Sequence, residues 1–572
     1  TPAAELDAFM QAHGDLAPVR RLRYRYANYL GRSRDWTPYL RFYEQHYANE
    51  RLDALDCFAL RAYRARGDDV QEMAARLWLV GRSQHDYCDP AFSLLKKNGV
   101  INDQLIRERL QLAIDARKFG LAGYLAGLLG DETAKATVAR WREASRAPAK
   151  TLANAKGFSA AQLVYATRRL ALSDAPAASG AFKKLDRNNR FSAEQRGATL
   201  RYIAIAGSQD HEPLAAALIA AVPESHRDQR LLEWEIRTAL RVGNWQRVLQ
   251  VIALLPDDAQ ASDRWRYWEA KALGMLGQTE AANGLMTRVA EERSFYGFLA
   301  ADHRGVRYGM APAALTADET LLQALLAEPA IVRVQELHAV GQTQRAAAEW
   351  QRALRTRSTD VKTQAAILAH RWGWHREAIA ILGTLKLWDD LEIRYPLAFS
   401  DAVEAYSANH GVDPTFALGI LRSESLYDRE ARSSAGAWGL MQLIPATGKR
   451  MAKKDNLRWQ GIETLKNADS NIRLGTRYLG ELLNRFEHPA LAAAAYNAGP
   501  HRVERWLPET SAMPADVWIE SIAYDETRAY VQRVLAAKIV FGWRLNSDTL
   551  KLSDSLPLIA PKESTVSALS RL

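Results

Sequence analysis

TALRVGNWQRVLQVIALLP, residues 238–256, contains two amphipathic segments on either side of Gly243. Apolar residues recur at intervals of three and four in both segments, which predicts a helix, a tight turn and a second helix. The same pattern returns in EAKALGMLGQTEAANGLMTRVA, where the turn falls at Gly277. It occurs twice more, with turns at Gly341 and Gly373. The resulting period of about 32 to 34 positions predicts helical hairpins that stack into a superhelix.

Runs of alternating apolar and polar residues are few, so we expect an all-α fold whose array is a degenerate solenoid of tetratricopeptide type. Each hairpin of a solenoid is buried only by its neighbours, which leaves a long concave surface for an extended partner or another domain. Tyr395 and Pro396 interrupt the helical pattern, and the final ~25 residues have no period and read as an extension or tail. We expect three parts: an α-superhelical domain at 1–325, a helical linker domain closing the array at 326–395, and a further domain at 396–572.

The composition is that of an ordered protein with more than one core, since 572 residues with 48% apolar and 25% charged side chains exceed what a single core supports. Its longest apolar stretches, such as residues 214–222, are shorter than the ~18 residues that a transmembrane helix needs. The net charge of +10 favours a polyanionic partner, namely nucleic acid, an anionic envelope polymer or a lipid surface. No groove-reading motif accompanies the charge, which argues against sequence-specific nucleic-acid binding.

The chain contains two cysteines, Cys57 and Cys88. This pair permits one disulfide or two buried thiols, and it excludes a cysteine-rich zinc site. The chain starts at Thr1, which fits either a removed export signal or a trimmed chain.

One carboxylate, Glu424, lies on the apolar face of a predicted helix. Asp413 followed by Pro414 is a strong helix start, with a side-chain cap and a proline in the first turn. At ~100° per residue, Glu424 falls on the stripe formed by Phe416 and Ile420. Burial there disfavours the charged form and raises the pKa, which suits a general acid for glycoside cleavage. A buried glutamate bonded to backbone at a helix end is the structural alternative.

Three motifs follow the predicted acid. SSAGAWGLMQLIP contains Gly436 and Gly439, which allow either a tight turn or a close approach of backbone to a sugar. DSNIRLGTRYLGELLNRF reads as an amphipathic scaffold helix. ALAAAAYNAGPHRVERW reads as a small-residue helix that ends at Gly499 and delivers Tyr496 and Asn497 at its end, where they could reach a cleft.

The predicted acid, these motifs and WIESIAYDETRAYV follow one another within the range 424–531. Together they resemble the soluble lytic transglycosylases of Gram-negative bacteria, which have a goose-lysozyme-like catalytic domain. SFYGFLAADHRG at 294–305 and RYPLAF at 394–399 extend the resemblance into the array. The resemblance implies that the array curves into a ring that carries a lysozyme-like, mainly α catalytic domain at 396–572.

The resemblance also implies residue roles. Glu424 would be the sole catalytic acid and base, and an acidic residue of the last motif, Glu520 or more readily Glu526, would contact substrate. The other residues expected to bind the sugar are Ser425, Ser433, Met441, Gln442, Tyr496 and Asn497. Trp438 departs from the small residue that is frequent in the family, so the shape of that subsite edge is open.

The implied reaction is non-hydrolytic. The nearest acids, Asp428 and Glu430, fall in a polar loop that we expect to be exposed, so we infer no carboxylate nucleophile. Glu424 would protonate the bond between N-acetylmuramic acid and N-acetylglucosamine, the substrate acetamido group would stabilise the cationic centre, and the muramoyl 6-hydroxyl would close a 1,6-anhydro ring. No metal or organic cofactor is expected, and the sequence shows no P-loop, dinucleotide or metal-ligand motif.

The family resemblance further implies a periplasmic protein whose signal peptide has been removed, which favours a disulfide between Cys57 and Cys88. Expected partners are peptidoglycan glycan strands and possible penicillin-binding proteins or other cell-wall enzymes, with no nucleic acid and no transmembrane segment. Two alternatives are a hydrolase with the same cleft and a scaffold whose array recruits envelope partners. The sequence does not decide between cleavage from chain ends and internal cleavage.

Overall fold

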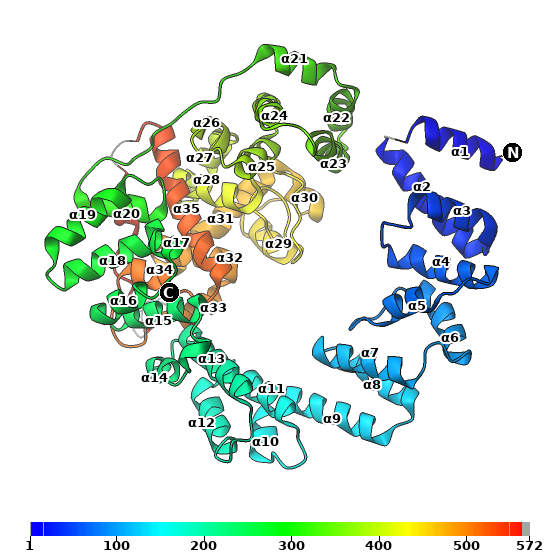
Figure 1. The fold of residues 1–572 in the computed structure, drawn as a ribbon. Coiled ribbons are helices and arrows are strands. Elements are labelled where there is room, and N and C mark those ends of the chain that lie inside the picture. The colour runs from blue at the N-terminus through cyan, green and yellow to red at the C-terminus, as the bar shows by residue number, and fades with distance from the viewer. Residues whose placement is uncertain (1, 15, 548–549, 563–572) are drawn as a thin grey trace. The chain divides into compact units, whose positions relative to one another are not determined.

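The computed structural model describes residues 2–14, 16–547 and 550–562 (Figure 1). Those residues form helices and no strand, with three isolated β-bridges, so the all-α prediction is confirmed. None of their helices is long and apolar enough to span a membrane. The chain divides into two compact units, residues 1–173 with 177–195 and residues 174–176 with 196–572.

The first unit is a succession of short helices, in which neighbours along the chain pack against each other, for example α7 on α8 and α8 on α9. Its helices are α1 (Pro2–Ala12), α2 (Ala17–Ser33), α3 (Trp36–His46), α4 (Asp53–Arg66), α5 (Gln71–Trp78), η1 (Asp86–Cys88), α6 (Asp89–Lys97), α7 (Asp103–Asp115), α8 (Phe119–Leu129), α9 (Glu132–Arg146), α10 (Pro148–Ala153), α11 (Ala160–Ala171) and α12 (Ala175–Leu185). A disulfide joins Cys57 of α4 to Cys88 of η1, and both residues are fully buried in the core of this unit.

The second unit continues the helical array. Its first helices are α13 (Ala193–Gln209), α14 (Ala215–Ala220), η2 (Glu224–His226), α15 (Gln229–Arg241), α16 (Trp245–Ile252), α17 (Asp257–Gln260), α18 (Asp263–Met275), α19 (Thr279–Ala290), α20 (Phe295–Arg304), α21 (Glu319–Ala327), α22 (Pro329–Ala339), α23 (Thr343–Leu354), α24 (Thr359–Arg371), α25 (His375–Leu385) and α26 (Leu391–Arg394). The four predicted turn glycines all have positive φ and each separates two packed helices, which confirms the hairpins: Gly243 (φ 68), Gly277 (φ 82), Gly341 (φ 74) and Gly373 (φ 72). Closure of the array into a ring stays a prediction.

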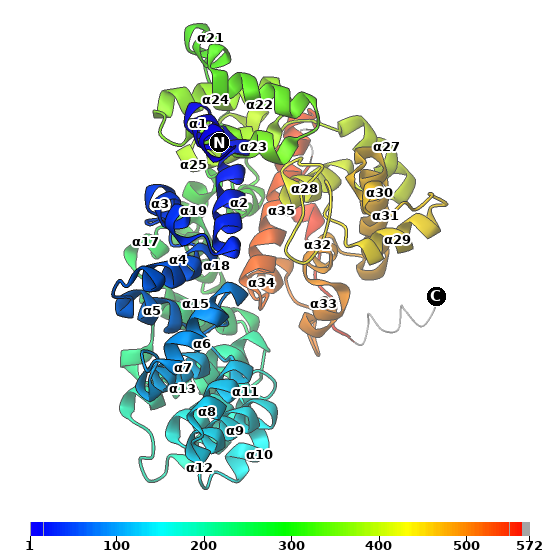
Figure 2. The same cartoon turned by 90° about the vertical axis from the view of Figure 1, so that its right-hand side faces the viewer.

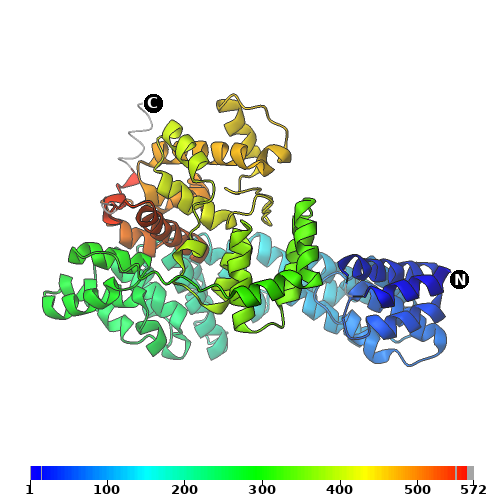
Figure 3. The same cartoon turned by 90° about the horizontal axis from the view of Figure 1, so that it is seen from above.

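The remaining helices of this unit form a bundle. They are α27 (Ser400–His410), α28 (Pro414–Ser425), α29 (Pro445–Lys454), α30 (Ile462–Lys466), α31 (Ala468–Phe486), α32 (Pro489–Ala498), α33 (Pro500–Trp506), α34 (Ala515–Glu520), α35 (Asp525–Arg544) and η3 (Ser553–Ser555). Tyr395 and Pro396 lie in the break between α26 and α27, as predicted. One hydrophobic core nevertheless continues from Leu232 of α15 to Ile559, and Figure 3 shows the yellow-to-red bundle lying against the green helices.

A fully buried ion pair fixes the bundle to the array. Glu520, at the end of α34, accepts a hydrogen bond from Nε of Arg237 on α15 at 2.9 Å. Its second carboxylate oxygen accepts from the hydroxyl of Tyr296 on α20, and Arg264 lies 3.7 Å away. Because a buried carboxylate without partners is strongly destabilising, these contacts determine where α34 lies against the array.

The described part of the expected C-terminal tail, residues 550–562, is packed rather than free. Ile559 and Met513 exchange two backbone hydrogen bonds of 2.8 and 2.9 Å, and both Leu552 and Ile559 are buried. The N–H of Leu552 also donates to the Tyr308 hydroxyl at 2.8 Å. The expected extension thus packs on the bundle over these residues, where isolated apolar side chains fill gaps in the core without making a periodic pattern.

Candidate active site

The helix that carries Glu424 forms as the sequence predicts. Asp413 caps α28 by accepting a hydrogen bond from the N–H of Thr415 at 2.8 Å, and Pro414 is its first residue. Phe416 and Ile420 are buried on the face that leads to Glu424. Glu424 is the penultimate residue of the helix and is half-buried.

The Tyr530 hydroxyl donates a hydrogen bond to Oε1 of Glu424 at 2.6 Å. Burial is the largest influence on the pKa of Glu424 and raises it; the Tyr530 hydrogen bond and the charge of Arg533 lower it, and the negative charge of Glu526 raises it. The net result is a pKa of about 7. Its pKa therefore lies close to neutral pH, where both the protonated and the ionised form are accessible. A carboxyl group in this state can donate a proton and later accept one.

The two helices that carry Glu424 and Tyr530 approach each other closely. α28 and α35 lie side by side (Figure 2). A Cβ atom on Gly419 of α28 would lie 2.8 Å from the carbonyl oxygen of Val534 on α35. Only glycine allows this separation without a shift of backbone, so the packing of the helices sets the distance between the acid and its phenol.

The chain turns in an unusual way directly after the acid. Leu426 (φ 49) and Tyr427 (φ 71) are both left-handed, a conformation that costs each non-glycine residue about 1–3 kcal/mol. The Tyr427 N–H donates to Oγ of Ser425 at 3.1 Å. Its hydroxyl donates to the carbonyl of Pro396 at 2.9 Å, and its side chain is buried. These contacts compensate for the strain in the turn.

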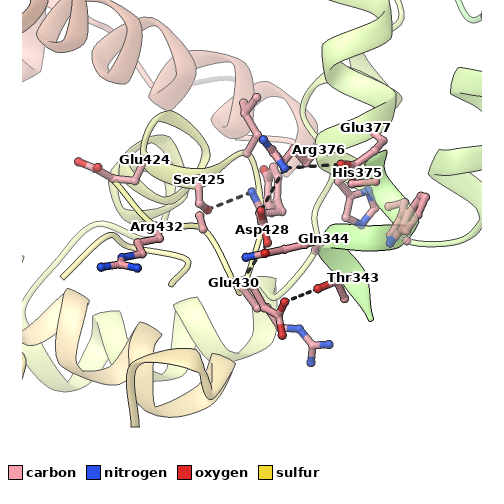
Figure 4. Close-up of a pocket in the computed structure, with 18 of the residues that line it drawn as sticks. Thr343, Gln344, His375, Arg376, Glu377, Glu424, Ser425, Asp428, Glu430 and Arg432 are labelled. Atoms are coloured by element: carbon pink, nitrogen blue, oxygen red, sulfur yellow. Dashed lines mark hydrogen bonds and ion pairs between the residues drawn. The ribbon is translucent and has the colours of Figure 1, made fainter. Parts of the chain in front are cut away.

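Glu424 borders a cavity of about 960 Å³. Of the residues predicted to bind sugar, Ser425, Ser433 and Gln442 line it. Its opposite wall comes from the array, and Figure 4 shows side chains of α23 and α25 facing the loop after α28. Its array residues include His338, Thr343, Gln344, Trp374, His375, Arg376 and Glu377.

The three predicted residues on the cavity wall already make contacts within the chain. The Ser425 hydroxyl lies 3.3 Å from the Leu421 carbonyl and also accepts the bond from Tyr427, so it stabilises the helix end. Oγ of Ser433 accepts the N–H of Ala437 at 3.0 Å. The Gln442 amide donates to two backbone carbonyls, at 2.8 and 2.9 Å, which holds its side chain beside the cavity.

The other predicted residues lie outside the lining of this cavity. Met441 is fully buried, and its carbonyl accepts the Tyr496 hydroxyl at 2.7 Å. Burial raises the pKa of Tyr496, and the charge of Glu424 raises it as well. This influence of Glu424 indicates that the phenol lies near the acid. Oδ1 of Asn497 accepts the hydroxyl of Thr527 at 2.7 Å.

The structure distinguishes the two acidic candidates of the last motif. Glu520 is completely buried in its contacts with the array and cannot reach a ligand without breaking them. Glu526 is exposed on the first turn of α35, one turn before Tyr530, and its charge acts on Glu424.

Sequence reasoning missed several residues. Tyr530 lies inside a quoted motif, but only tertiary packing reveals that it contacts Glu424. Oγ of Ser423 lines the cavity and has no hydrogen-bond partner among the described residues. Asp428 and Glu430 were expected to be exposed, yet both are half-buried and bind the array, so that expectation was wrong.

Two solved structures share this fold over almost the whole chain. An inactive mutant of the lytic transglycosylase Slt from Pseudomonas aeruginosa is 32% identical with a TM-score of 0.82, and the match covers 97% of this chain and 91% of that one. The 70 kDa soluble lytic transglycosylase of Escherichia coli is 28% identical with a TM-score of 0.85, covering 98% and 91%. The helical array, the lysozyme-like bundle and its half-buried acid thus define a lytic enzyme of the bacterial cell wall.

The sequence comparisons give the family. Residues 401–519 match the Transglycosylase SLT domain, and residues 324–391 match the Soluble lytic murein transglycosylase L domain. The soluble lytic murein transglycosylase of Salmonella typhimurium is 30% identical over 568 residues, covering 97% of this chain and 87% of the relative. That of Escherichia coli K12 is 29% identical, covering 94% and 84%. The chain belongs to the soluble lytic murein transglycosylase family.

Proposed function

We propose that Glu424 is the single general acid and base of a reaction that cleaves the β-1,4 bond between N-acetylmuramic acid and N-acetylglucosamine without water and forms 1,6-anhydromuropeptides. The observation that carries the proposal is a half-buried carboxyl group whose pKa is raised to about 7 and which borders a large cavity. An acid whose pKa lies near neutral pH suits both proton transfers.

The proposed steps follow from one carboxyl group. Protonated Glu424 gives its proton to the glycosidic oxygen as the bond to the muramoyl C1 breaks. The carbonyl oxygen of the substrate acetamido group stabilises the positive charge at C1. The carboxylate of Glu424 then takes the proton from the muramoyl 6-hydroxyl, whose oxygen bonds to C1 and displaces the acetamido group. Glu424 ends protonated, ready for the next turnover.

The surroundings of Glu424 support a mechanism without a second catalytic carboxylate. A retaining glycosidase places its nucleophilic carboxylate about 5 Å from the acid. Asp428 pairs with Arg376, and Glu430 binds Thr343, so both acids of the loop after α28 have other partners. Glu526, whose charge also acts on Glu424, is exposed and is proposed below as a substrate contact. The Pseudomonas relative, whose inactive form replaces one glutamate by glutamine, is consistent with a single essential acid.

Substrate contacts extend the proposal. Ser433 and Gln442 would face a sugar in the cavity, while Met441, Tyr496 and Asn497 would shape the wall around the acid. Glu526, which is exposed near Glu424, would be the additional acidic residue that contacts the substrate. Ser425, next to the acid, would act by stabilising the turn that follows it.

We also propose that the chain comprises an α-superhelical domain at 1–325, a linker domain at 326–395 and a catalytic domain at 396–572. The family and the net charge of +10 support peptidoglycan strands as substrate in the periplasm. Penicillin-binding proteins or other cell-wall enzymes are proposed as partners of the array.

The test is digestion of purified sacculi with the unaltered protein, with Glu424→Gln and with Glu404→Gln, which alters an exposed glutamate of α27. We expect anhydro products, loss of turnover in E424Q and full turnover in E404Q. Mass spectrometry decides the reaction type, because a hydrolase gives products heavier by one water. Unchanged turnover in E424Q would refute the acid assignment, and an inactive unaltered protein would favour the scaffold alternative.

A further inference from the structure

The loop that follows the catalytic acid is attached to two hairpin turns of the region that matches the L domain. We propose that Arg376 and Thr343 are positioning residues, which hold the strained loop 426–430 and thereby fix the carboxyl group of Glu424 for proton transfer. The proposal rests on the assignment of Glu424 as the acid. If these residues act in this way, the region that matches the L domain (residues 324–391, the L region) contributes directly to catalysis and does not serve only as a structural connection.

The first attachment comes from the turn before α25. Gly373 ends the preceding hairpin helix in the left-handed region, and the chain then enters α25 at His375. Arg376 binds the carboxylate of Asp428 at 3.3 Å across the cavity wall (Figure 4). Asp428 in turn accepts the N–H of Glu430 at 2.9 Å, so that one carboxylate links the array to the backbone of the loop.

The second attachment comes from the turn before α23. Gly341 has the same left-handed conformation as its counterpart Gly373 in the next hairpin. The hydroxyl of Thr343, the first residue of α23, donates to Oε2 of Glu430 (Figure 4). The repeated glycine turns thus bring one polar side chain each to the same short loop.

The loop itself explains why attachments are needed. Leu426 and Tyr427 are two consecutive left-handed residues that are not glycine, and bulky residues in this region relax unless neighbours hold them. The ring of His375 lies 5.6 Å from that of Tyr427 and packs on it edge-on. Since Glu424 is only two positions before Leu426, relaxation of the loop would move the last turn of α28 and the carboxyl group with it.

The attachments contribute little to overall stability. The side chains of Arg376 and Asp428 are 47% and 25% exposed, and exposed ion pairs contribute little to folding. A misplacement of about 1 Å at a reacting group can nevertheless reduce turnover by up to about 100-fold. A loss of kcat with unchanged Tm and KM therefore identifies positioning and distinguishes it from a general structural role.

The matched control is Arg371 of the L region, which is also 47% exposed and pairs with Glu319 of α21 at 2.9 Å. It does not line the cavity. Turnover of sacculi, KM and Tm are measured for Arg376→Ala, Arg376→Lys, Thr343→Val, the R376A/T343V double variant and Arg371→Ala. Glu424→Gln is assayed in parallel.

We expect kcat to fall about tenfold in R376A and severalfold in T343V. The KM and Tm of both variants should equal those of the unaltered protein within error. In the double variant, kcat should fall by less than the product of the two single effects. R376K should recover most of the activity, and R371A should equal the unaltered protein. Turnover within twofold of normal in R376A and T343V, with E424Q inactive, would overturn this inference alone. An equal loss in R371A would also overturn it, whereas an active E424Q would refute the proposed function.

Discussion

Replacing Glu424 by glutamine should make the protein more stable, and by an amount that depends on pH. The pKa of Glu424 lies at about 7 in the folded protein and at 4.5 when the side chain is free in water. The folded state therefore binds this proton more tightly than the unfolded state. The resulting contribution to stability is complete below pH 4.5 and is lost as the pH rises to about 7.

The size of the effect follows from the two pKa values. Each pH unit between them corresponds to about 1.4 kcal/mol, so ionisation of Glu424 lowers the free energy of unfolding by about 3 kcal/mol above pH 7. Glutamine has no charge to desolvate, and its amide oxygen can still accept the hydrogen bond from Tyr530. E424Q should therefore match the unaltered protein at low pH and exceed its stability by about 3 kcal/mol at about pH 8.

Urea unfolding of both proteins, followed by tryptophan fluorescence at several pH values between about 4.5 and 8, measures this difference. Glu404→Gln is the control, because its exposed side chain should give a difference near zero throughout. A stability difference between E424Q and the unaltered protein that does not change with pH would refute the reasoning, since it would show that Glu424 titrates alike in the folded and unfolded states.

Three further predictions concern residues that contact or position the acid and the ion pair that attaches its bundle to the array. Tyr530→Phe removes a hydrogen bond that favours the charged carboxylate, so the basic limb of kcat/KM, set by Glu424, should move to higher pH; an unmoved limb in the pH profile would contradict this. Gly419→Ala should cost about 1–3 kcal/mol in thermal unfolding and reduce kcat, because the new methyl group meets the Val534 carbonyl; a variant with unchanged Tm and turnover would show that the helices separate freely. Glu520→Gln should cost about 3–5 kcal/mol by leaving a buried guanidinium uncompensated, measured by urea unfolding, and a loss below ~1 kcal/mol would disprove the role of the pair.

Local signals in the sequence predicted local features of the fold. Glycine turns between amphipathic segments gave the hairpins, because a left-handed residue that ends a helix is usually glycine. The Asp413 cap gave the start of α28, and helical periodicity put Glu424 on a buried face. Each of these features depends on residues within one or two helical turns, so a single sequence contains the information.

The surroundings of the acid could not be predicted in this way. Tyr530 and Glu424 lie on helices that are far apart along the chain, and Arg376 of α25 is far in sequence from its partner Asp428 in the loop after α28, so both contacts depend on tertiary packing. The exposure expected for Asp428 was wrong because polar composition does not show that another part of the chain covers a loop. Met441 was predicted to bind sugar because it belongs to a motif, yet its side chain is fully buried. Membership of a motif does not reveal whether a side chain faces a ligand or the interior.

The buried pair between Glu520 and Arg237 bears on how this enzyme could be dissected. Cutting the chain at 396, where helical periodicity breaks, would leave the carboxylate of Glu520 without its guanidinium and uncover apolar surface on α34 and α35. A fragment made that way would be prone to aggregate, and its low activity would be mistaken for evidence that the array recruits substrate. To separate a role of the array in substrate recruitment from its role in folding, exposed residues of the array should be substituted and the chain should not be truncated.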